Sequence, residues 1–176
     1  MRTRLHRAAA LAALVALGTL PGLAQASGHA PGRAQIRSAV ARAERSRNLW
    51  ATVNVCDTPR HPSTIGIRGQ MPALGFPARL YMRIEVQYLS LPDKHFRPAP
   101  GASKWIGLGQ RRSGVRQGGV LFRFSAHAGL LRGSVRFQWK LGTRVIGQLT
   151  QATVRGHPGA DYGDPPHHSL GTCLIS

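Results

Sequence analysis

The chain has 176 residues, enough for one domain of ordinary size and a short appendage, and its 24 Lys and Arg against six Asp and Glu give a formal net charge of +18. A hydrophobic content of 42% excludes wholesale disorder, and the scarcity of carboxylates leaves little room for acid–base catalysis. Because 21 of the 24 cations are Arg, codon usage in a GC-rich genome is an alternative explanation of the charge.

The first 26 residues have the pattern of an export signal. Three arginines form a positively charged start (Arg2, Arg4 and Arg7), residues 8–20 are apolar, and Ala24-Gln25-Ala26 is a small-x-small cleavage site. An uncleaved membrane anchor is the alternative, although the apolar stretch is short for a span, and no later segment has 18 consecutive apolar residues. We therefore expect a secreted or cell-surface protein with no transmembrane segment in the mature chain.

Residues 27–49 are expected to be a basic linker or a short helix. Ile36, Val40 and Ala43 have helical spacing in an Ala- and Arg-rich stretch, which predicts a helix with a narrow apolar stripe between residues 33 and 48. A poorly ordered linker is the alternative, because so short a helix is marginal in water.

Residues 50–176 have the pattern of an all-β domain. Apolar and polar residues alternate most clearly over residues 80–89. The predicted strands are residues 50–56, 64–70, 80–89, 103–108, 120–125, 132–140, 143–154 and 170–175. Turn-forming residues fill the gaps, including residues 98–101 and a long loop over residues 156–168. About eight such strands predict a two-sheet antiparallel β-sandwich of immunoglobulin-like architecture, with a barrel as the alternative.

Two predicted strands supply the expected core. Their inward residues are Val120, Phe122 and Phe124 on one strand and Val135, Phe137 and Trp139 on the other, and we expect the two strands to be neighbours. Arg123 and Arg136 should face outward. Glu85 lies on the polar face of its strand, which predicts a cross-strand ion pair with an Arg. Trp50 and Trp105 are not assigned to either face.

Cys56 and Cys173 are the two cysteines of the chain. An even number of cysteines in an exported protein predicts a disulfide, and two cysteines allow one intramolecular pairing, between the first and last predicted strands. Metal ligation by this pair is disfavoured, because neither belongs to a C-x-x-C group.

Four segments carry a resemblance to other proteins. They are Trp50-Ala-Thr-Val-Asn-Val-Cys56-Asp57-Thr58, Tyr81-Met-Arg, Arg132-Gly-Ser-Val-Arg-Phe-Gln-Trp139 and a terminal Ser-Leu-x-x-Cys173. Together they resemble uncharacterised secreted proteins of high-GC bacteria with an immunoglobulin-like β-sandwich. The resemblance covers most of the predicted domain and implies no activity. Because the Cys pair is terminal, the likeness to immunoglobulin domains is one of architecture.

Motifs for catalysis are scarce. The sequence has no G-x-S-x-G nucleophile elbow, and Ser125 near His127 is the closest local pair for a serine hydrolase. One polar cluster in the long loop has ligand types that suit zinc or copper, namely Asp161, Asp164, His167 and His168. Its spacing matches no known ligand pattern, and a solvated turn is the alternative. We therefore expect no cofactor, no metal and no enzyme activity.

The arginines provide the one positive functional signal. Arg68, Arg83, Arg123 and Arg136, with Arg144 as a further candidate, fall on outward positions and would give one sheet a basic face. We expect a secreted, non-enzymatic binding or structural module, with an anionic cell-wall or extracellular polymer as its partner. The alternatives are a hydrolase or metal-binding protein that uses the loop from Asp161 to His168, and a carbohydrate-binding module that uses exposed Trp.

Overall fold

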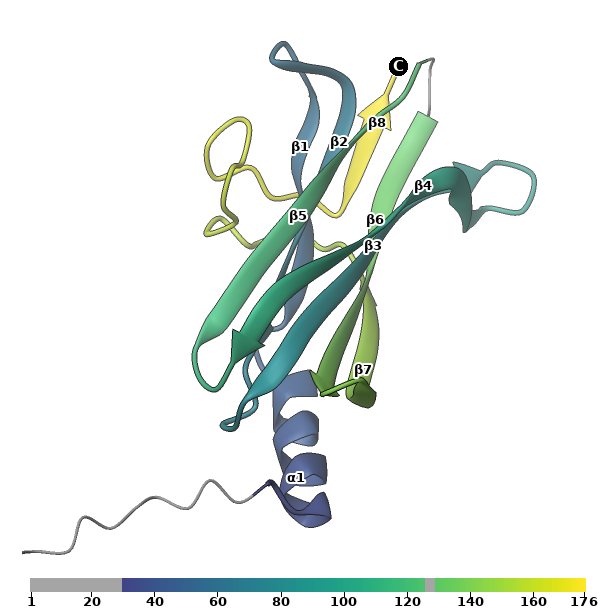
Figure 1. Ribbon diagram of the computed structural model, residues 1–176. Coiled ribbons are helices and arrows are strands. Elements are labelled where there is room, and N and C mark those ends of the chain that lie inside the picture. Colours follow the sequence, from purple (N-terminus) through teal and green to yellow (C-terminus); the bar gives the residue numbers. More distant parts are fainter. Residues whose placement is uncertain (1–29, 126–128) are drawn as a thin grey trace, which may run out of the picture. The chain divides into compact units, whose positions relative to one another are not determined.

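The computed structural model describes residues 30–125 and 129–176, which contain one helix and eight strands (Figure 1). In chain order they are α1 (Arg33–Glu44), β1 (Trp50–Thr58), β2 (His61–Pro72), β3 (Ala78–Ser90), β4 (His95–Arg111), β5 (Val115–Arg123), β6 (Gly129–Leu141), β7 (Arg144–Ala152) and β8 (Thr172–Ile175). The predicted export signal lies outside the described residues. Within them, no helix is long and apolar enough to cross a membrane.

The strands form two antiparallel sheets, which confirms the predicted β-sandwich over the barrel. One sheet has three strands in the order β1-β2-β5, and the other has five, in the order β4-β3-β6-β7 with β8 paired to β6. Along one edge of β6, β8 pairs with residues 129–132 and β7 with residues 134–141. The last two strands therefore follow each other along a single edge.

The edge strand β4 is longer than the sequence predicts. It begins at His95, and the predicted turn at residues 98–101 lies inside it. The ladder with β3 is irregular there, since Pro98 pairs with Gln87 while Ser103 pairs with Glu85. Proline is tolerated at a bulge on an edge strand, because its missing N–H leaves no central ladder bond unmade. The turn signals therefore mark a bulge instead of a strand end.

The core lies between the two sheets. On β6, Val135, Phe137 and Trp139 are fully buried, as predicted, and the indole Nε1 of Trp139 donates a hydrogen bond of 2.8 Å to the carbonyl of Pro72. Val120 and Phe122 of β5, and Phe124 directly after it, pack against this core but are only half-buried.

The prediction that β5 and β6 are neighbours is wrong. β5 pairs with β2 in the three-stranded sheet, whereas β6 lies between β3 and β7 in the five-stranded sheet. Alternation along a strand predicts which side chains face inward, but it does not specify the partner strand.

The segment expected as a linker or helix is the helix α1, which lies at one end of the sandwich (Figure 1). Its buried residues are Ile36, Ala39, Val40 and Ala43. A Cβ at Gly147 of β7 would come within 2.5 Å of Val40, so the absence of a side chain there lets the helix approach the sheet. Packing of the apolar stripe, more than helix propensity, stabilises this short helix.

A disulfide joins Cys56 of β1 to Cys173 of β8, as predicted, across a Cα–Cα distance of 5.4 Å. It therefore links the three-stranded sheet to the five-stranded sheet. Closing a loop of 117 residues removes entropy from the unfolded chain. In the chain-entropy model, this contributes on the order of 5 kcal/mol of stability.

Candidate functional site

The outward side chains of β3 and β6 form a surface rich in cations, which we call the basic face. Its members are Arg79, Tyr81, Arg83, Glu85 and Gln87 of β3 and Arg132, Ser134, Arg136, Gln138 and Lys140 of β6. They face outward because the residues between them on both strands are buried in the core. Five cations and one carboxylate therefore share this surface.

The register of the two strands places like charges opposite one another. Arg79 pairs with Lys140, and Arg83 pairs with Arg136. Like charges directly opposite in a sheet repel, so this arrangement costs stability in the free protein. An anion bound across either pair would relieve the repulsion.

Aromatic rings flank the cations. The Nζ of Lys140 lies 4.7 Å from the centre of the Tyr81 ring, and the guanidinium of Arg132 lies 4.1 Å from that of Phe96 on β4. Trp105, opposite Arg83 in the β3–β4 ladder, is 47% exposed. Cation–π contacts hold Lys140 and Arg132 close to the sheet.

The single carboxylate of the basic face does not form the predicted cross-strand pair. Glu85 forms an ion pair of 3.5 Å with Arg83, two residues earlier on the same strand and the same side of the sheet. Its direct cross-strand neighbours are Ser103 and Ser134, so no Arg lies opposite it. The basic face keeps four cations without a carboxylate partner among the residues that the structure describes.

The four arginines predicted to share one sheet divide between two. Arg83 and Arg136 lie on the basic face, but Arg68 of β2 and Arg123 of β5 lie on the three-stranded sheet. Arg144, at the start of β7, is exposed. Three further cations of the basic face, Arg79, Arg132 and Lys140, were not predicted, although alternation places them outward. The missing information was which strands are paired.

Part of the outer face of the three-stranded sheet is covered by residues 153–171, which we call the C-terminal loop. Thr52 and Asn54 of β1 point outward yet are almost fully buried beneath it. The hydroxyl of Thr52 lies 2.7 Å from that of Ser169. The amide of Asn54 donates to the carbonyls of Asp161 and Tyr162 at 2.9 and 3.1 Å.

Further contacts fasten the same loop to β5 and to the start of β1. The side chain of Gln117 accepts from the backbone N–H of Asp161 at 2.9 Å and donates to the carbonyl of Gly159 at 2.9 Å. The ring of His157 stacks on Trp50, with centroids 4.8 Å apart. Burial lowers the pKa of His157, because the charged imidazolium is less well solvated there.

The structure does not bring the predicted metal candidates together. The carboxylate of Asp164 accepts a hydrogen bond from Thr58, and the Nδ1 of His167 lies 3.1 Å from the carbonyl of Pro158. The Nε2 of His168 is buried without a partner. Within residues 30–125 and 129–176, no three His, Cys, Asp or Glu side chains are grouped as a metal site would require. The candidate pair Ser125 and His127 cannot be placed, since His127 lies outside the described residues.

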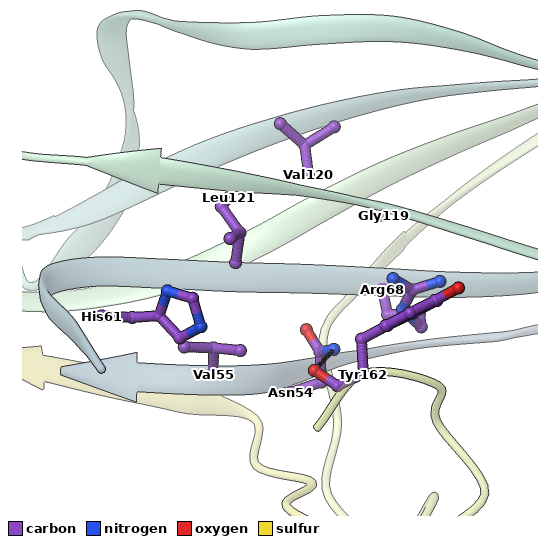
Figure 2. A pocket seen from close by; sticks show the side chains of 8 residues that line it. All are labelled: Asn54, Val55, His61, Arg68, Gly119, Val120, Leu121 and Tyr162. Atoms are coloured by element: carbon purple, nitrogen blue, oxygen red, sulfur yellow. Dashed lines mark hydrogen bonds between the residues drawn. The ribbon is translucent and has the colours of Figure 1, made fainter. Parts of the chain in front are cut away.

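A hollow of about 390 Å³ lies beside Tyr162 of the C-terminal loop, on the part of the sheet that the loop leaves open (Figure 2). Its lining residues are Asn54, Val55, His61, Arg68, Gly119, Val120, Leu121 and Tyr162. The guanidinium carbon of Arg68 lies 4.8 Å from the centre of the Tyr162 ring. Burial lowers the pKa of Arg68, and the nearby Asp161 carboxylate opposes this shift.

Comparison with known proteins identifies no family. No family model and no curated protein matches the chain. Among solved structures, a glycosyl hydrolase family 2 member from Bacteroides cellulosilyticus is similar at 8% identity and a TM-score of 0.36, over 62% of this chain and 15% of that one. A putative beta-galactosidase from Bacteroides fragilis is similar at 14% identity and a TM-score of 0.33, over 62% of this chain and 16% of that one. At these TM-scores, neither similarity assigns a function. The predicted membership of a group of secreted bacterial proteins stays a prediction.

Proposed function

We propose that this protein is an exported, non-enzymatic binding module whose basic face binds an anionic polymer of the cell envelope. The observation that carries the proposal is the outer surface of β3 and β6, where five cations accompany one carboxylate. Polyanions bind such surfaces because each neutralised charge releases counterions.

The spacing of the cations favours a polymer over a small anion. The pair Arg79 and Lys140, the pair Arg83 and Arg136, and Arg132 lie at successive intervals of four residues along β6. At roughly 3.3 Å per residue, these positions repeat about every 13 Å along the sheet. An extended chain with regularly spaced phosphates or carboxylates could contact all three positions at once.

The distribution of Trp favours an anionic polymer over a neutral glycan. Sugars stack on flat exposed aromatic rings, but Trp139 and Trp50 are buried. Trp105 is the exposed indole, and it lies beside Arg83. One aromatic platform next to cations suits a charged polymer better than a neutral one.

Two further features support export and binding. The disulfide between Cys56 and Cys173 is typical of proteins from oxidising compartments. Two polar side chains of the predicted hydrolase loop contact the protein itself, since Asp164 accepts a hydrogen bond from Thr58 and the Nδ1 of His167 lies 3.1 Å from the carbonyl of Pro158. That loop therefore offers less support for catalysis than the basic face offers for binding.

Binding of the purified protein to sodium polyphosphate and to polygalacturonate, with dextran as the neutral control, tests the proposal. We expect binding to both polyanions that weakens steeply as salt rises, and none to dextran. Arg83→Gln/Arg136→Gln removes two cations and should reduce the slope of log affinity against log salt by about 1.5.

A matched control removes the same charge from the other sheet. Arg116→Gln/Arg123→Gln changes two exposed cations of β5 and should bind almost as the wild type does. Equal weakening in both double variants would show that net charge alone attracts the polymer, and would contradict a specific basic face. Tight binding to dextran or preference for a DNA duplex would also contradict the proposal.

A further inference from the structure

We propose that the hollow between Tyr162 and His61 binds a small carboxylate with an apolar body, with the carboxylate on Arg68 (Figure 2). The hollow lies on the outer face of the three-stranded sheet, and the basic face lies on the outside of the other sheet. The two sites share no residue, so this inference does not depend on the proposed function.

Arg68 is a half-buried cation that is not in ion-pair contact with a carboxylate, although the Asp161 carboxylate is near enough to act on its charge. Its Nε is buried and has no hydrogen-bond partner, and no carboxylate in residues 30–125 and 129–176 lies within 4.0 Å of the guanidinium. Its close neighbour is the face of Tyr162, which attracts a cation but accepts no in-plane hydrogen bond. Because desolvation outweighs the effect of Asp161, the charge of Arg68 is only partly compensated, and an anion in direct contact with the guanidinium would stabilise it.

The neighbouring strand leaves room for this placement of Arg68. Gly119 lies opposite Arg68 in the β2–β5 ladder, and a Cβ there would be 3.2 Å from Nε and 2.7 Å from the carbonyl of Ile67. Without a side chain at Gly119, the guanidinium can lie across β5 and line the hollow. A guanidinium fixed in this way presents a planar set of donors that suits a carboxylate.

The middle of the hollow is apolar. Val55 and Leu121 lie between Arg68 at one end and His61 at the other (Figure 2), and Leu121 is 51% exposed. Gly66 lies beneath them, and a Cβ there would come within 2.8 Å of both side chains. The volume of about 390 Å³ falls in the range of small-molecule sites.

The lining distinguishes a monocarboxylate from a phosphate. Arg68 is the one guanidinium or ammonium group among the lining residues, and a single positive charge balances a monoanion better than a dianion. Val55 and Leu121 line the middle of the hollow, so phosphate oxygens that point toward these two side chains would have no donor. A free carboxylic acid and the C-terminal carboxylate of a peptide carry the same group, so the test must separate them.

Titration of the purified ¹⁵N-labelled protein, followed by NMR, tests the inference with four probes. Phenylacetate represents a free acid and N-acetyl-leucine a peptide terminus, and N-acetyl-leucinamide and inorganic phosphate are their neutral and dianionic controls. We expect one or both acids to bind with a dissociation constant of about 1 mM or tighter, as suits ligands of this size. The amides of Val55, Gly119 and Leu121 should shift, while the indole N–H of Trp105 on the basic-face side should not.

Three variants locate the site. Arg68→Met should weaken acid binding at least about 10-fold, the loss expected for a charge-assisted hydrogen bond. Leu121→Trp should weaken it similarly by filling the apolar middle, and it changes an exposed residue, so the fold should survive. Arg123→Gln, two residues away on β5 and outside the lining, is the control and should bind as the wild type does.

Several results would overturn the inference. They are the absence of acid binding up to about 10 mM, equal binding of N-acetyl-leucine and its amide, tighter binding of phosphate, or unchanged affinity in both Arg68→Met and Leu121→Trp. Shifts confined to Trp105 and the amides of β3 and β6 would place the acids on the basic face. That result would overturn the pocket while leaving the proposed function intact.

Discussion

The two outer faces of the sandwich begin from the same strand pattern but differ in the folded protein. On both sheets, outward polar residues alternate with residues of the core. On the three-stranded sheet the C-terminal loop covers Thr52 and Asn54, so both are buried and hydrogen-bonded. On the five-stranded sheet, Arg136 and Trp105 remain exposed.

The difference shows that the role of an outward polar residue depends on whether another segment of the chain packs over it. Under the loop, a polar side chain must find a partner, because an unpaired buried polar group is costly. On the open face, water solvates the side chains, and charges of one sign can gather at small cost. The covered face is therefore suited to stability and a defined pocket, and the open face to binding a large partner.

Phe137→Ala should have the largest effect on stability, because Phe137 packs in the core between the two sheets. Its ring is fully buried, and a Cβ at Gly69 of the other sheet would lie 3.1 Å from it. We expect a loss of about 3–5 kcal/mol in the free energy of unfolding, from lost transfer energy and the cavity. Denaturant unfolding measures the loss, and Leu174→Ala, at a residue that is 62% exposed, is the control. Loss of amide protection on one face alone would contradict a shared core.

Asn54→Ala should show that polar residues contribute more to stability on the covered face than on the open face. It removes the donor to two loop carbonyls, and we expect a loss of about 1–3 kcal/mol with faster amide exchange in residues 153–171. Ser134→Ala, the matched change on the basic face, should alter stability by no more than about 0.5 kcal/mol. Equal losses in the two variants would mean that the loop contributes nothing to the stability of its sheet.

Arg136→Gln should stabilise the protein slightly, since Arg136 lies directly opposite Arg83. Removing one of two like charges is expected to raise the free energy of unfolding by about 0.2–0.5 kcal/mol at low salt. The gain should fade at high salt, where the repulsion is screened. Arg123→Gln, opposite Thr64 on the other sheet, should show no such gain. If Arg136→Gln instead lowers stability at low salt, the repulsion between Arg83 and Arg136 is already offset by other groups, and the prediction is wrong.

The smallest expected effect is a dependence on pH at His157. Because burial lowers its pKa in the folded protein, the unfolded chain binds more protons as the pH falls through the unfolded value of about 6.5. Stability is therefore present above that value and lost as the pH falls toward and below the folded pKa. His157 lines a second hollow, separate from the one beside Arg68. The charged residue that shares this lining is Arg47, and no carboxylate belongs to it, so no anionic partner would offset the loss. His157 is partly exposed, and solvent screening keeps the effect small.

Comparing the Tm of the wild type with that of His157→Gln between about pH 7.5 and about pH 5 isolates this effect from the other histidines. The variant should lose less Tm on acidification than the wild type does. An identical decline in the two proteins would show that the stack of His157 on Trp50 adds no pH sensitivity.

Much of the architecture could be read from residue patterns, but the candidate sites could not. Alternation over residues 80–89 predicted β3 and its buried side, and it was confirmed to within two residues at either end. The pattern failed at residues 98–101, where proline and glycine mark a bulge in β4. It also placed Arg68 on an open face, whereas Tyr162, far along the chain, stacks against it.

The sequence by itself determined the all-β class, the disulfide between Cys56 and Cys173, and the inward side of strands such as β6. It could do so because alternation and a single cysteine pair are local or unambiguous signals. Only the tertiary structure decided that Arg83 faces Arg136, and that the C-terminal loop covers one sheet and leaves a hollow beside Arg68. Strand pairing and the path of a long loop depend on packing between residues that are distant in the chain. A local sequence pattern does not specify such packing.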